Sequence, residues 1–355
     1  MSGAAPNLRR SLPGFVTAIA SALVGGGLFA VVGLPMPWLL GSIVGTAIAT
    51  MGGLPVRVPS VLRDLVLVIL GLMIGATLDP AVLGHLAQWP VSLIGVILYV
   101  AVATTGQYQF LRRVGGYDAP TAYFSAAPGG FMAMTVIGGS FGGQERTIAL
   151  MHAVRVVLVV FIIVMGYHLI VGSSGANTAE YVALGSISPY DLATLAGLGA
   201  LGALAARVLR LPAHTLLGPL LVMASLRLTG VIDIAVPSAP IVVAEIVLGS
   251  SIGAQFAGAT LAELRRGFLL SLISTLFMLA LTGVFAVAVH ALSGLPIDAL
   301  LLAFSPGGMS GISLIALALN IEPAFVTVHN MTRVLVILVA GPALFGARVK
   351  ADASE

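Results

Sequence analysis

The segment AFSPGGMSGISLIAL at residues 303–317 has a counterpart 178 positions earlier, SAAPGGFMAMTVIGG at residues 125–139 (303 − 125). Each copy leads into an apolar stretch that carries an arginine, Arg155 in the first and Arg333 in the second, and these are also 178 positions apart (333 − 155). A helix-breaking Pro-Gly-Gly and a charged residue are both costly in lipid-soluble sequence. Finding both twice at one spacing therefore indicates that they serve the function.

The composition is typical of an all-α, polytopic membrane protein. Hydrophobic residues make up 59% and charged residues 8% of the 355 residues, and the mean hydropathy is +1.10. Soluble domains carry about a quarter charged residues, so no globular alternative fits. The net charge is only +3 and no basic run occurs, so we expect no nucleic-acid partner. Cysteine is absent, which excludes disulfides and thiolate-bound metals.

Apolar windows predict ten membrane-spanning helices, five in each half. A glycine-interrupted segment in each half, at 119–143 and 297–320, holds the Pro-Gly-Gly. We therefore divide the chain into a first transmembrane repeat (1–172), a linker (173–189) and a second transmembrane repeat (190–348). The predicted helices span residues 14–32, 36–53, 61–78, 91–111 and 146–171, then 190–208, 213–230, 239–257, 267–293 and 324–347.

The placement of arginine predicts that the two repeats are inverted. If the arginines at 9–10 are cytoplasmic, alternate crossings place Arg57 and Arg112 on the cytoplasmic side too. In the second half, the arginines at 207–210 and 265–266 fall in the loops equivalent to those on the other side of the membrane. Inversion requires an odd number of crossings per half, which five helices satisfy if each Pro-Gly-Gly segment re-enters by the same face. Both termini are then cytoplasmic. The alternative is twelve full crossings with parallel repeats, which leaves four arginines outside.

Arg155 and Arg333 are predicted to reach the bilayer midplane from opposite faces. Each lies nine residues beyond the start of its predicted helix, at Arg146 and Ala324, or about 13 Å deep. The guanidinium group keeps its charge and presents five donors in a planar fork that suits carboxylate, phosphate or sulfonate. The alternative is that each arginine pairs with a nearby acid or caps the carbonyls of a broken helix.

The Pro-Gly-Gly segments predict the other part of an anion site. Proline ends one arm, and the glycines let the backbone approach a ligand closely. The next arm, beginning at Phe131 or Met309, then directs its free N–H groups toward the midplane, unless the motif is a simple kink in a crossing helix. His152, His329 and Asn330 share helix faces with the arginines, the histidines either for proton transfer or for a structural hydrogen bond. The candidate substrate-binding residues are Pro128, Gly129, Gly130, His152, Arg155, Pro306, Gly307, Gly308, His329, Asn330 and Arg333.

Glu245 is the carboxylate that falls well inside a predicted apolar helix. We expect it to couple transport to protons, and the alternative is a buried structural ion pair. No pair of intramembrane aspartates is present, so proton coupling is favoured over sodium coupling.

The duplicated Pro-Gly-Gly with its arginine helix resembles the AbrB-type family of bacterial membrane proteins. Leu-Leu-Gly at 39–41 and 216–218 and Ile-Gly-Ala at 74–76 and 252–254 carry the same resemblance, which covers residues 14–347. It implies a bacterial inner-membrane location and a distant relation to the cation/proton antiporter and anion transporter superfamily, with inverted repeats and discontinuous helices that cross at the midplane. The family shares only its name with a soluble DNA-binding regulator.

Functions of different classes remain open at this point. The first is a secondary, non-enzymatic transporter for a small anionic solute, bound between the two Pro-Gly-Gly segments, without catalytic residues, metal or cofactor. Its expected partners are the substrate and the lipid bilayer, with a homodimer left open. The second is a membrane-bound monooxygenase, a label that family members carry, although the six histidines are scattered and form no HxxxH or ExxH pair. A membrane sensor or regulator that transports nothing is the third.

Overall fold

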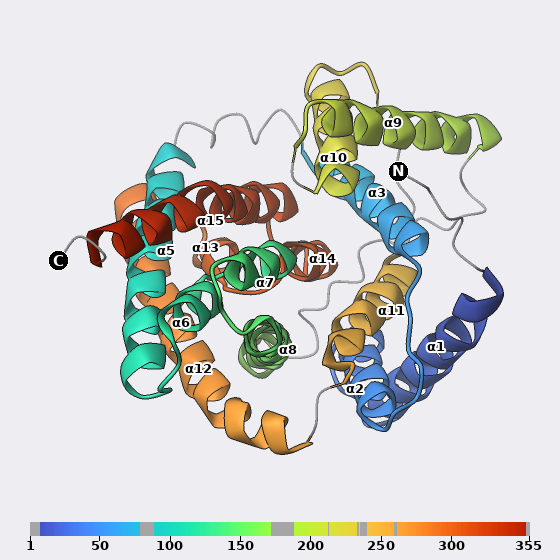
Figure 1. Cartoon of the computed structure of the whole chain (residues 1–355). Helices are drawn as coiled ribbons and strands as arrows, with labels where there is room; N and C mark the ends of the chain where they lie inside the picture. Colours follow the sequence, from blue (N-terminus) through green and yellow to red (C-terminus); the bar gives the residue numbers. More distant parts are fainter. Residues whose placement is uncertain are drawn as a thin grey trace. The chain divides into compact units, whose positions relative to one another are not determined.

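The computed structural model describes residues 8–78, 89–171, 188–211, 213–232, 234, 240–258 and 261–352. Within this part of the chain the regular structure is helical, in fourteen α-helices and one short 3-10 helix (Figure 1). The all-α prediction is confirmed. Residues 173–187 of the predicted linker lie outside the described residues.

The helices of the first half follow the predicted segments closely. The glycine-interrupted segment forms two short helices of eight and ten residues, separated at the Pro-Gly-Gly. The helices are α1 (Leu8–Val31), α2 (Pro37–Met51), α3 (Ser60–Ala76), α5 (Trp89–Arg113), α6 (Ala119–Ala126), α7 (Phe131–Ser140) and α8 (Glu145–Val171).

The second half has helices in the same order, again with two short ones of eight and ten residues on either side of the Pro-Gly-Gly. They are α9 (Pro189–Val208), α10 (His214–Leu228), α11 (Pro240–Gly253) with the 3-10 helix η4 (Ala254–Phe256), α12 (Leu261–Ser293), α13 (Ile297–Phe304), α14 (Met309–Ala318) and α15 (Pro323–Asp352).

Six of the described helices are long and apolar enough to cross a membrane, which identifies a multi-pass membrane protein. The other four predicted spans, α2, α3, α10 and α11, are 14 to 17 residues long. At about 1.5 Å per residue they fall short of a hydrocarbon core of about 30 Å. Proline and glycine set these limits: α2, for example, begins at Pro37 and is capped by Gly52. Full crossing by these four helices stays a prediction. The six long spans are Leu12–Val31, Trp89–Arg113, Glu145–Ile170, Pro189–Val208, Gly267–Ser293 and Pro323–Gly346.

The chain folds into two compact units, and both halves of the sequence contribute to each. Unit 1 comprises residues 1–76 and 163–261, and it contains α1, α2, α3, α9, α10 and α11. Unit 2 comprises residues 77–162 and 262–355, and it contains α5, α6, α7, most of α8, and α12 to α15. The compact units therefore cut across the two repeats predicted from the sequence.

The helices of unit 1 pack through glycines in a reciprocal pattern. α2 packs against α11 from the other half, and α10 packs against α3. A Cβ atom on Gly71 of α3 would clash with the carbonyl oxygen of Leu216 in α10. One on Gly249 of α11 would lie 2.7 Å from the carbonyl oxygen of Leu39 in α2. These glycines form packing faces, because only a residue without a side chain lets the backbones approach so closely.

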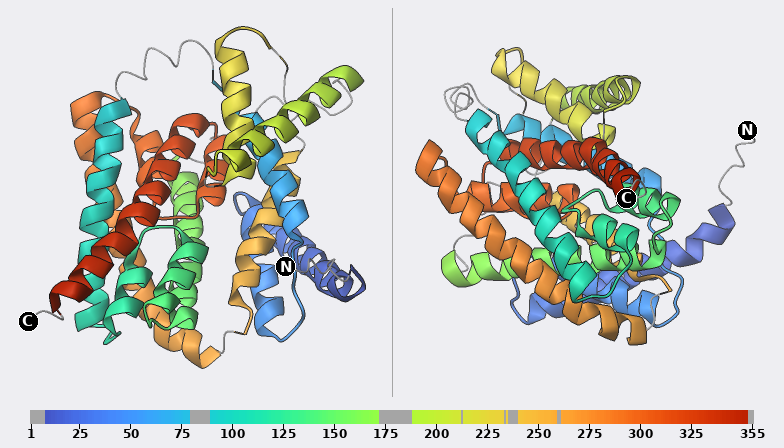
Figure 2. Two further views of the ribbon diagram at one scale, coloured as in Figure 1. Left: turned by 45° about the horizontal axis from the view of Figure 1, so that its top comes forward. Right: turned by 60° about the vertical axis from the view of Figure 1, so that its left-hand side comes forward.

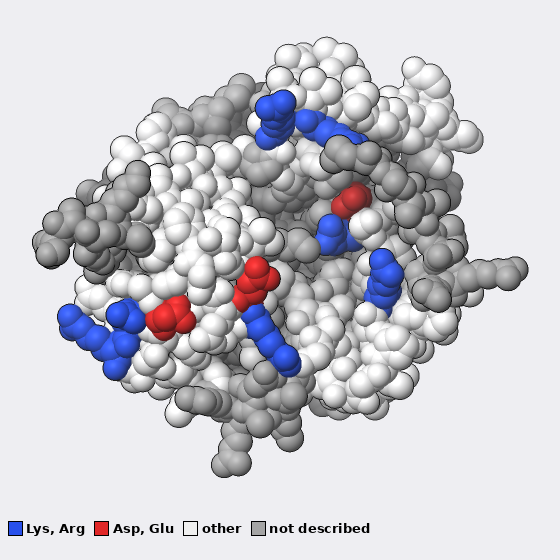
Figure 3. All heavy atoms as spheres, viewed as in Figure 1, with Lys and Arg blue, Asp and Glu red and all other residues white. Residues whose placement is uncertain are grey.

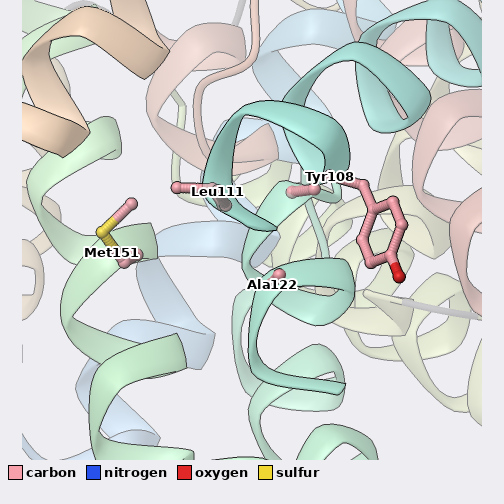
Figure 4. Packing of buried hydrophobic residues seen from close by; sticks show 5 residues of the cluster. Tyr108, Leu111, Ala122 and Met151 are labelled. Carbon is pink, nitrogen blue, oxygen red and sulfur yellow. The ribbon is translucent and has the colours of Figure 1, made fainter. Parts of the chain in front are cut away.

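In unit 2, α5 joins several elements. Tyr108 and Leu111 of α5 pack with Ala122 of α6 and Met151 of α8 in one buried apolar cluster (Figure 4). α5 and α12 run side by side (Figure 2), and the amide of Gln107 on α5 bonds both the hydroxyl and the carbonyl of a serine on α12. This packing holds α6 and α8 in place around the first Pro-Gly-Gly.

Charged side chains are sparse on the face of the molecule seen in Figure 3, where most of the described atoms are uncharged. Among the described helices, many large apolar side chains are exposed, including Val31 at 88% and Leu169 at 77%. Such exposure is expected where a helix faces lipid rather than water.

Candidate functional site

The first Pro-Gly-Gly lies at the tip of a hairpin formed by α6 and α7. Asp118 caps the start of α6, accepting from the backbone N–H of Thr121 at 2.8 Å. After α7 the chain returns to the same place, because the backbone N–H of Gln144 donates to the hydroxyl oxygen of Thr121, also at 2.8 Å. The two open ends of the segment therefore meet, as the re-entrant prediction requires.

The glycines of this first break adopt conformations that side chains disfavour. Gly129 has φ of +154° and Gly130 has φ of +69°. A Cβ atom on Gly129 would lie 3.7 Å from Nε of Arg333 and 3.6 Å from Ile337, both on α15. The first break thus lies against the arginine-bearing helix of the second half.

The second break needs glycine for a different reason. Gly308 has φ of −70°, which any residue can adopt, but a Cβ atom on Gly307 would lie 2.6 Å from Ile312. The same atom would lie 3.3 Å from Val159 of α8, and Val156 of α8 is the nearest neighbour of Gly308. The second break therefore lies against the arginine-bearing helix of the first half. Together the contacts show that both breaks lie between α8 and α15.

Arg155 on α8 caps the end of α6. Its Nη1 atom donates to the carbonyl of Ala127 at 2.6 Å, and its Nη2 atom donates to the carbonyl of Ser125. These carbonyls belong to the last turn of a helix, where no intrahelical donor is available. In Figure 1, which looks nearly along α8, α6 and α7 lie beside it.

Arg333 on α15 caps the end of α13 in the same way. Its Nη2 atom donates to the carbonyl of Gly307 at 2.9 Å, and its Nη1 atom donates to the carbonyls of Ser305 and, at 3.5 Å, Phe304. The capping alternative raised by the sequence is thus confirmed for the Nη atoms of both arginines. This capping leaves the Nε atom of each arginine without a partner among the described residues.

The two arginines hold equivalent positions along their helices, and both are buried. Each lies ten residues after the first residue of its helix (155 − 145 and 333 − 323), or about 15 Å along the axis. Arg155 is 2% exposed and Arg333 is 0% exposed. Neither forms an ion pair with a residue that the structure describes, and the two lie close enough to interact electrostatically.

The charge around the breaks is therefore positive. A helix C-terminus carries about half a negative charge, so two capped ends offset about one of the two guanidinium charges. The helices that follow the breaks, α7 and α14, start without a side-chain cap, so their positive ends add to the same region. An anion is the ligand that such an arrangement favours.

The two histidines have different surroundings. His152 joins the cap on α6, with Nε2 donating to the carbonyl of Phe124 at 2.9 Å. His329 faces α5 instead, with Nε2 and the hydroxyl of Ser92 2.7 Å apart and Nδ1 donating to the carbonyl of Phe325 at 2.8 Å. The structure thus brings His152 to the break and gives His329 partners away from it.

Asn330 and Glu245 are both buried, but they lie in different units. Asn330 is 0% exposed and lies one turn before Arg333 on α15, in unit 2. Glu245 is 6% exposed and lies on α11, in unit 1. No residue that the structure describes forms an ion pair with Glu245. A structural ion pair, one of its two predicted roles, is therefore not found within the described part of the chain.

Two serines at the breaks are features that the sequence reasoning did not single out. The hydroxyls of Ser125 and Ser305 are buried and have no partner among the described residues. Their carbonyls are also the ones that the arginines cap. Their positions, three residues before Pro128 and directly before Pro306, were the available signal.

A cavity of about 360 Å³ lies beside the start of α6. Its lining includes the polar residues Asp118 and Thr147 and the buried residues Met151, Val154 and Ser271.

Comparison with known sequences finds a matching family and similar bacterial proteins. The sequence model of a family described as "Transition state regulatory protein AbrB" matches residues 38–348. The chain is 26% identical to "Putative regulator AbrB" of Escherichia coli (strain K12), over 89% of this chain and 91% of that protein. It is also 26% identical to "Uncharacterized protein YhjN" of Bacillus subtilis (strain 168), over 92% of this chain and 91% of that protein.

Proposed function

The chain belongs to the AbrB family of membrane proteins, and we propose that it is a secondary transporter for a small anionic solute. The solute binds between the two Pro-Gly-Gly breaks, where Arg155 and Arg333 meet. The observation that carries the proposal is the pair of buried guanidinium groups, whose Nη atoms hold carbonyls and whose Nε atoms have no partner among the described residues. The proposal makes the protein a carrier rather than an enzyme.

Charge supports an anionic solute. The two buried cations form no ion pair among the described residues, and the negative ends of α6 and α13 offset only about one of their two charges. A buried charge without compensation is destabilising by several kcal/mol, and a bound anion would remove that cost. Arginine can cap a helix end and bind an anion at the same time, because one planar group can donate to a carbonyl with one edge and to an oxyanion with another.

The proposed mechanism is alternating access in an inverted repeat. The reciprocal contacts of α2 with α11 and of α10 with α3 are those that two equivalent halves related by a two-fold axis would make. The hairpin of α6 and α7 supports five crossings and one re-entrant segment per half. We therefore propose that both termini are cytoplasmic, in a bacterial inner membrane, with Glu245 as the coupling group.

The geometry of the described residues supports the monooxygenase and the sensor less well than the transporter. A metal-dependent monooxygenase needs a cluster of nitrogen and oxygen ligands. Among the described residues, no three or more His, Asp and Glu side chains lie close enough to share a metal ion. A sensor or regulator, the role in the printed name of one relative, would use the same anion site without moving the anion across the membrane.

Ligand binding followed by transport tests the proposal. The purified protein is screened for thermal stabilisation by acetate, succinate, methanesulfonate, phosphate and sulfate, with methylammonium as the cationic comparison. Anions that stabilise it are then offered to proteoliposomes. We expect at least one anion to bind and to be taken up, whereas stabilisation by methylammonium alone contradicts an anion site. Binding without uptake into proteoliposomes favours the sensor.

The arginine variants localise the binding. Arg155→Lys and Arg333→Lys keep the charge but lose the planar fork, so each should weaken anion binding by about tenfold to a hundredfold, as loss of a charge-assisted hydrogen bond does. Arg63→Lys is the matched control, since Arg63 is 44% exposed and pairs with Asp64 at 3.8 Å. Unchanged affinity in both Arg155→Lys and Arg333→Lys would leave these residues with the capping role alone.

A further inference from the structure

Five buried polar atoms around the two breaks have no partner among the described residues. They are Nε of Arg155, Nε of Arg333, the hydroxyls of Ser125 and Ser305, and Oδ1 of Asn330. Four of these groups can donate a hydrogen bond, and the amide oxygen of Asn330 can only accept one. Oδ1 of Asn330 is therefore the one member of the set that only a donor can satisfy.

The orientation of the Asn330 amide follows from its other end. Nδ2 donates to the carbonyl of Val326 at 2.9 Å, and a carbonyl cannot pair with Oδ1, so the nitrogen occupies that position. Oδ1 consequently points away from that bond. Asn330 is completely buried, and it lies three residues before Arg333, on the same face of α15.

The position equivalent to Asn330 in the first half carries a different side chain. His152 lies 178 positions earlier (330 − 152), three residues before Arg155, and its Nε2 atom donates to the carbonyl of Phe124. In a neutral imidazole the other nitrogen, Nδ1, is then an acceptor, as Oδ1 of Asn330 is. Of these two acceptors, Oδ1 of Asn330 is the one that is buried without a partner among the described residues.

From the buried, unpaired Oδ1 one turn from Arg333, we infer that the anion bound at the site carries a hydrogen-bond donor of its own, which pairs with Oδ1 of Asn330. The inference rests on the proposed function, because it assigns a chemical class to the same solute. That class comprises hydroxy acids, amino acids and protonated oxyanions such as phosphate. Acetate and sulfate, which lack a donor near neutral pH, are outside it. A buried acceptor left unpaired by such ligands would make their binding weaker.

Matched pairs of anions test the inference. Dissociation constants of the purified full-length protein are measured for glycolate against acetate and for phosphate against sulfate. We expect the donor-bearing member of each pair to bind roughly 5- to 100-fold more tightly, the range for one buried hydrogen bond. In Asn330→Leu, which keeps the branched shape of the side chain but has no acceptor, the preference should fall to within about twofold. Asn330→Ala repeats the measurement in case the leucine variant folds poorly.

A serine elsewhere in the chain supplies the control. Ser250 on α11 also has a buried hydroxyl without a partner among the described residues, and it lies in unit 1. Ser250→Ala should keep both the affinity and the preference.

The outcomes separate this inference from the proposed function. Equal binding within both pairs by the wild type overturns the inference and leaves an anion transporter. A preference that persists in Asn330→Leu and Asn330→Ala overturns the role of Asn330. Failure of every anion to bind contradicts the proposed function itself.

Discussion

At the scale of single residues, the guanidinium group explains why a charge is tolerated in an apolar interior. Each of Arg155 and Arg333 holds two or more carbonyls that the Pro-Gly-Gly would otherwise leave unpaired. A buried carbonyl without a donor costs about 1 to 3 kcal/mol, so the arginines and the breaks stabilise each other. Replacement of either arginine by alanine therefore removes a structural contact as well as a binding group.

Glu245 leads to a prediction at the same scale. It is almost fully buried, and a carboxyl in that setting can carry a proton between two conformations of a transporter. Glu245→Gln keeps the shape but cannot lose a proton. We expect this variant to bind the anion as the wild type does and to take it up without dependence on an imposed pH gradient, measured in proteoliposomes.

The control for this prediction is an exposed carboxylate. Glu322 precedes α15 and is exposed, so Glu322→Gln should leave the pH dependence intact. Wild-type uptake that follows a sodium gradient and ignores a proton gradient would show that proton coupling is wrong.

At the scale of elements, close helix contacts depend on glycines at defined positions. Gly71 and Gly249 lie where α3 meets α10 and α11 meets α2, and each faces a backbone carbonyl. At Gly283, on α12, a Cβ atom would meet no heavy atom within 4 Å other than those of its neighbours along the chain and its own helix backbone. Substitution by alanine should therefore lower the stability at Gly71 and Gly249 but not at Gly283.

The prediction compares alanine at these positions. Gly71→Ala and Gly249→Ala should each destabilise the protein by about 1 to 3 kcal/mol, because the helices must separate to admit the methyl group. Gly283→Ala should be neutral or stabilising by up to about 1 kcal/mol, because alanine restricts the unfolded chain. Thermal unfolding in detergent measures all three. Equal effects at Gly71 and Gly283 would contradict close packing of α3 on α10.

At the scale of the whole molecule, the inverted arrangement predicts the topology. With both termini cytoplasmic and an odd number of crossings per half, the linker between the halves is outside. The chain contains no cysteine, so single substitutions can be labelled without background. Ser174→Cys should react with a membrane-impermeant thiol reagent in intact cells, whereas Ser2→Cys and Ser354→Cys should react only after lysis. A protected Ser174→Cys would instead favour twelve crossings with parallel repeats.

The sequence by itself determined the class of protein and the order of its helices. Apolar windows located the helices because a lipid environment requires runs of apolar residues with internally paired backbones. The two Pro-Gly-Gly breaks were also predictable, since proline and glycine interrupt helices for local steric reasons. The same repeated motif carried the resemblance to the AbrB family, and the match of the family model over residues 38–348 confirms the membership.

Only the tertiary structure decided what the buried polar groups contact. Two equivalent arginines could have paired with acids, and the structure pairs them with carbonyls of the breaks. His152 and His329 look alike in sequence, yet only His152 joins a cap. The unpaired Nε atom of each guanidinium and the orientation of the Asn330 amide were likewise not predictable from the sequence. The physical reason is that a hydrogen bond depends on which atoms from distant segments meet, and helix periodicity carries no information about that meeting.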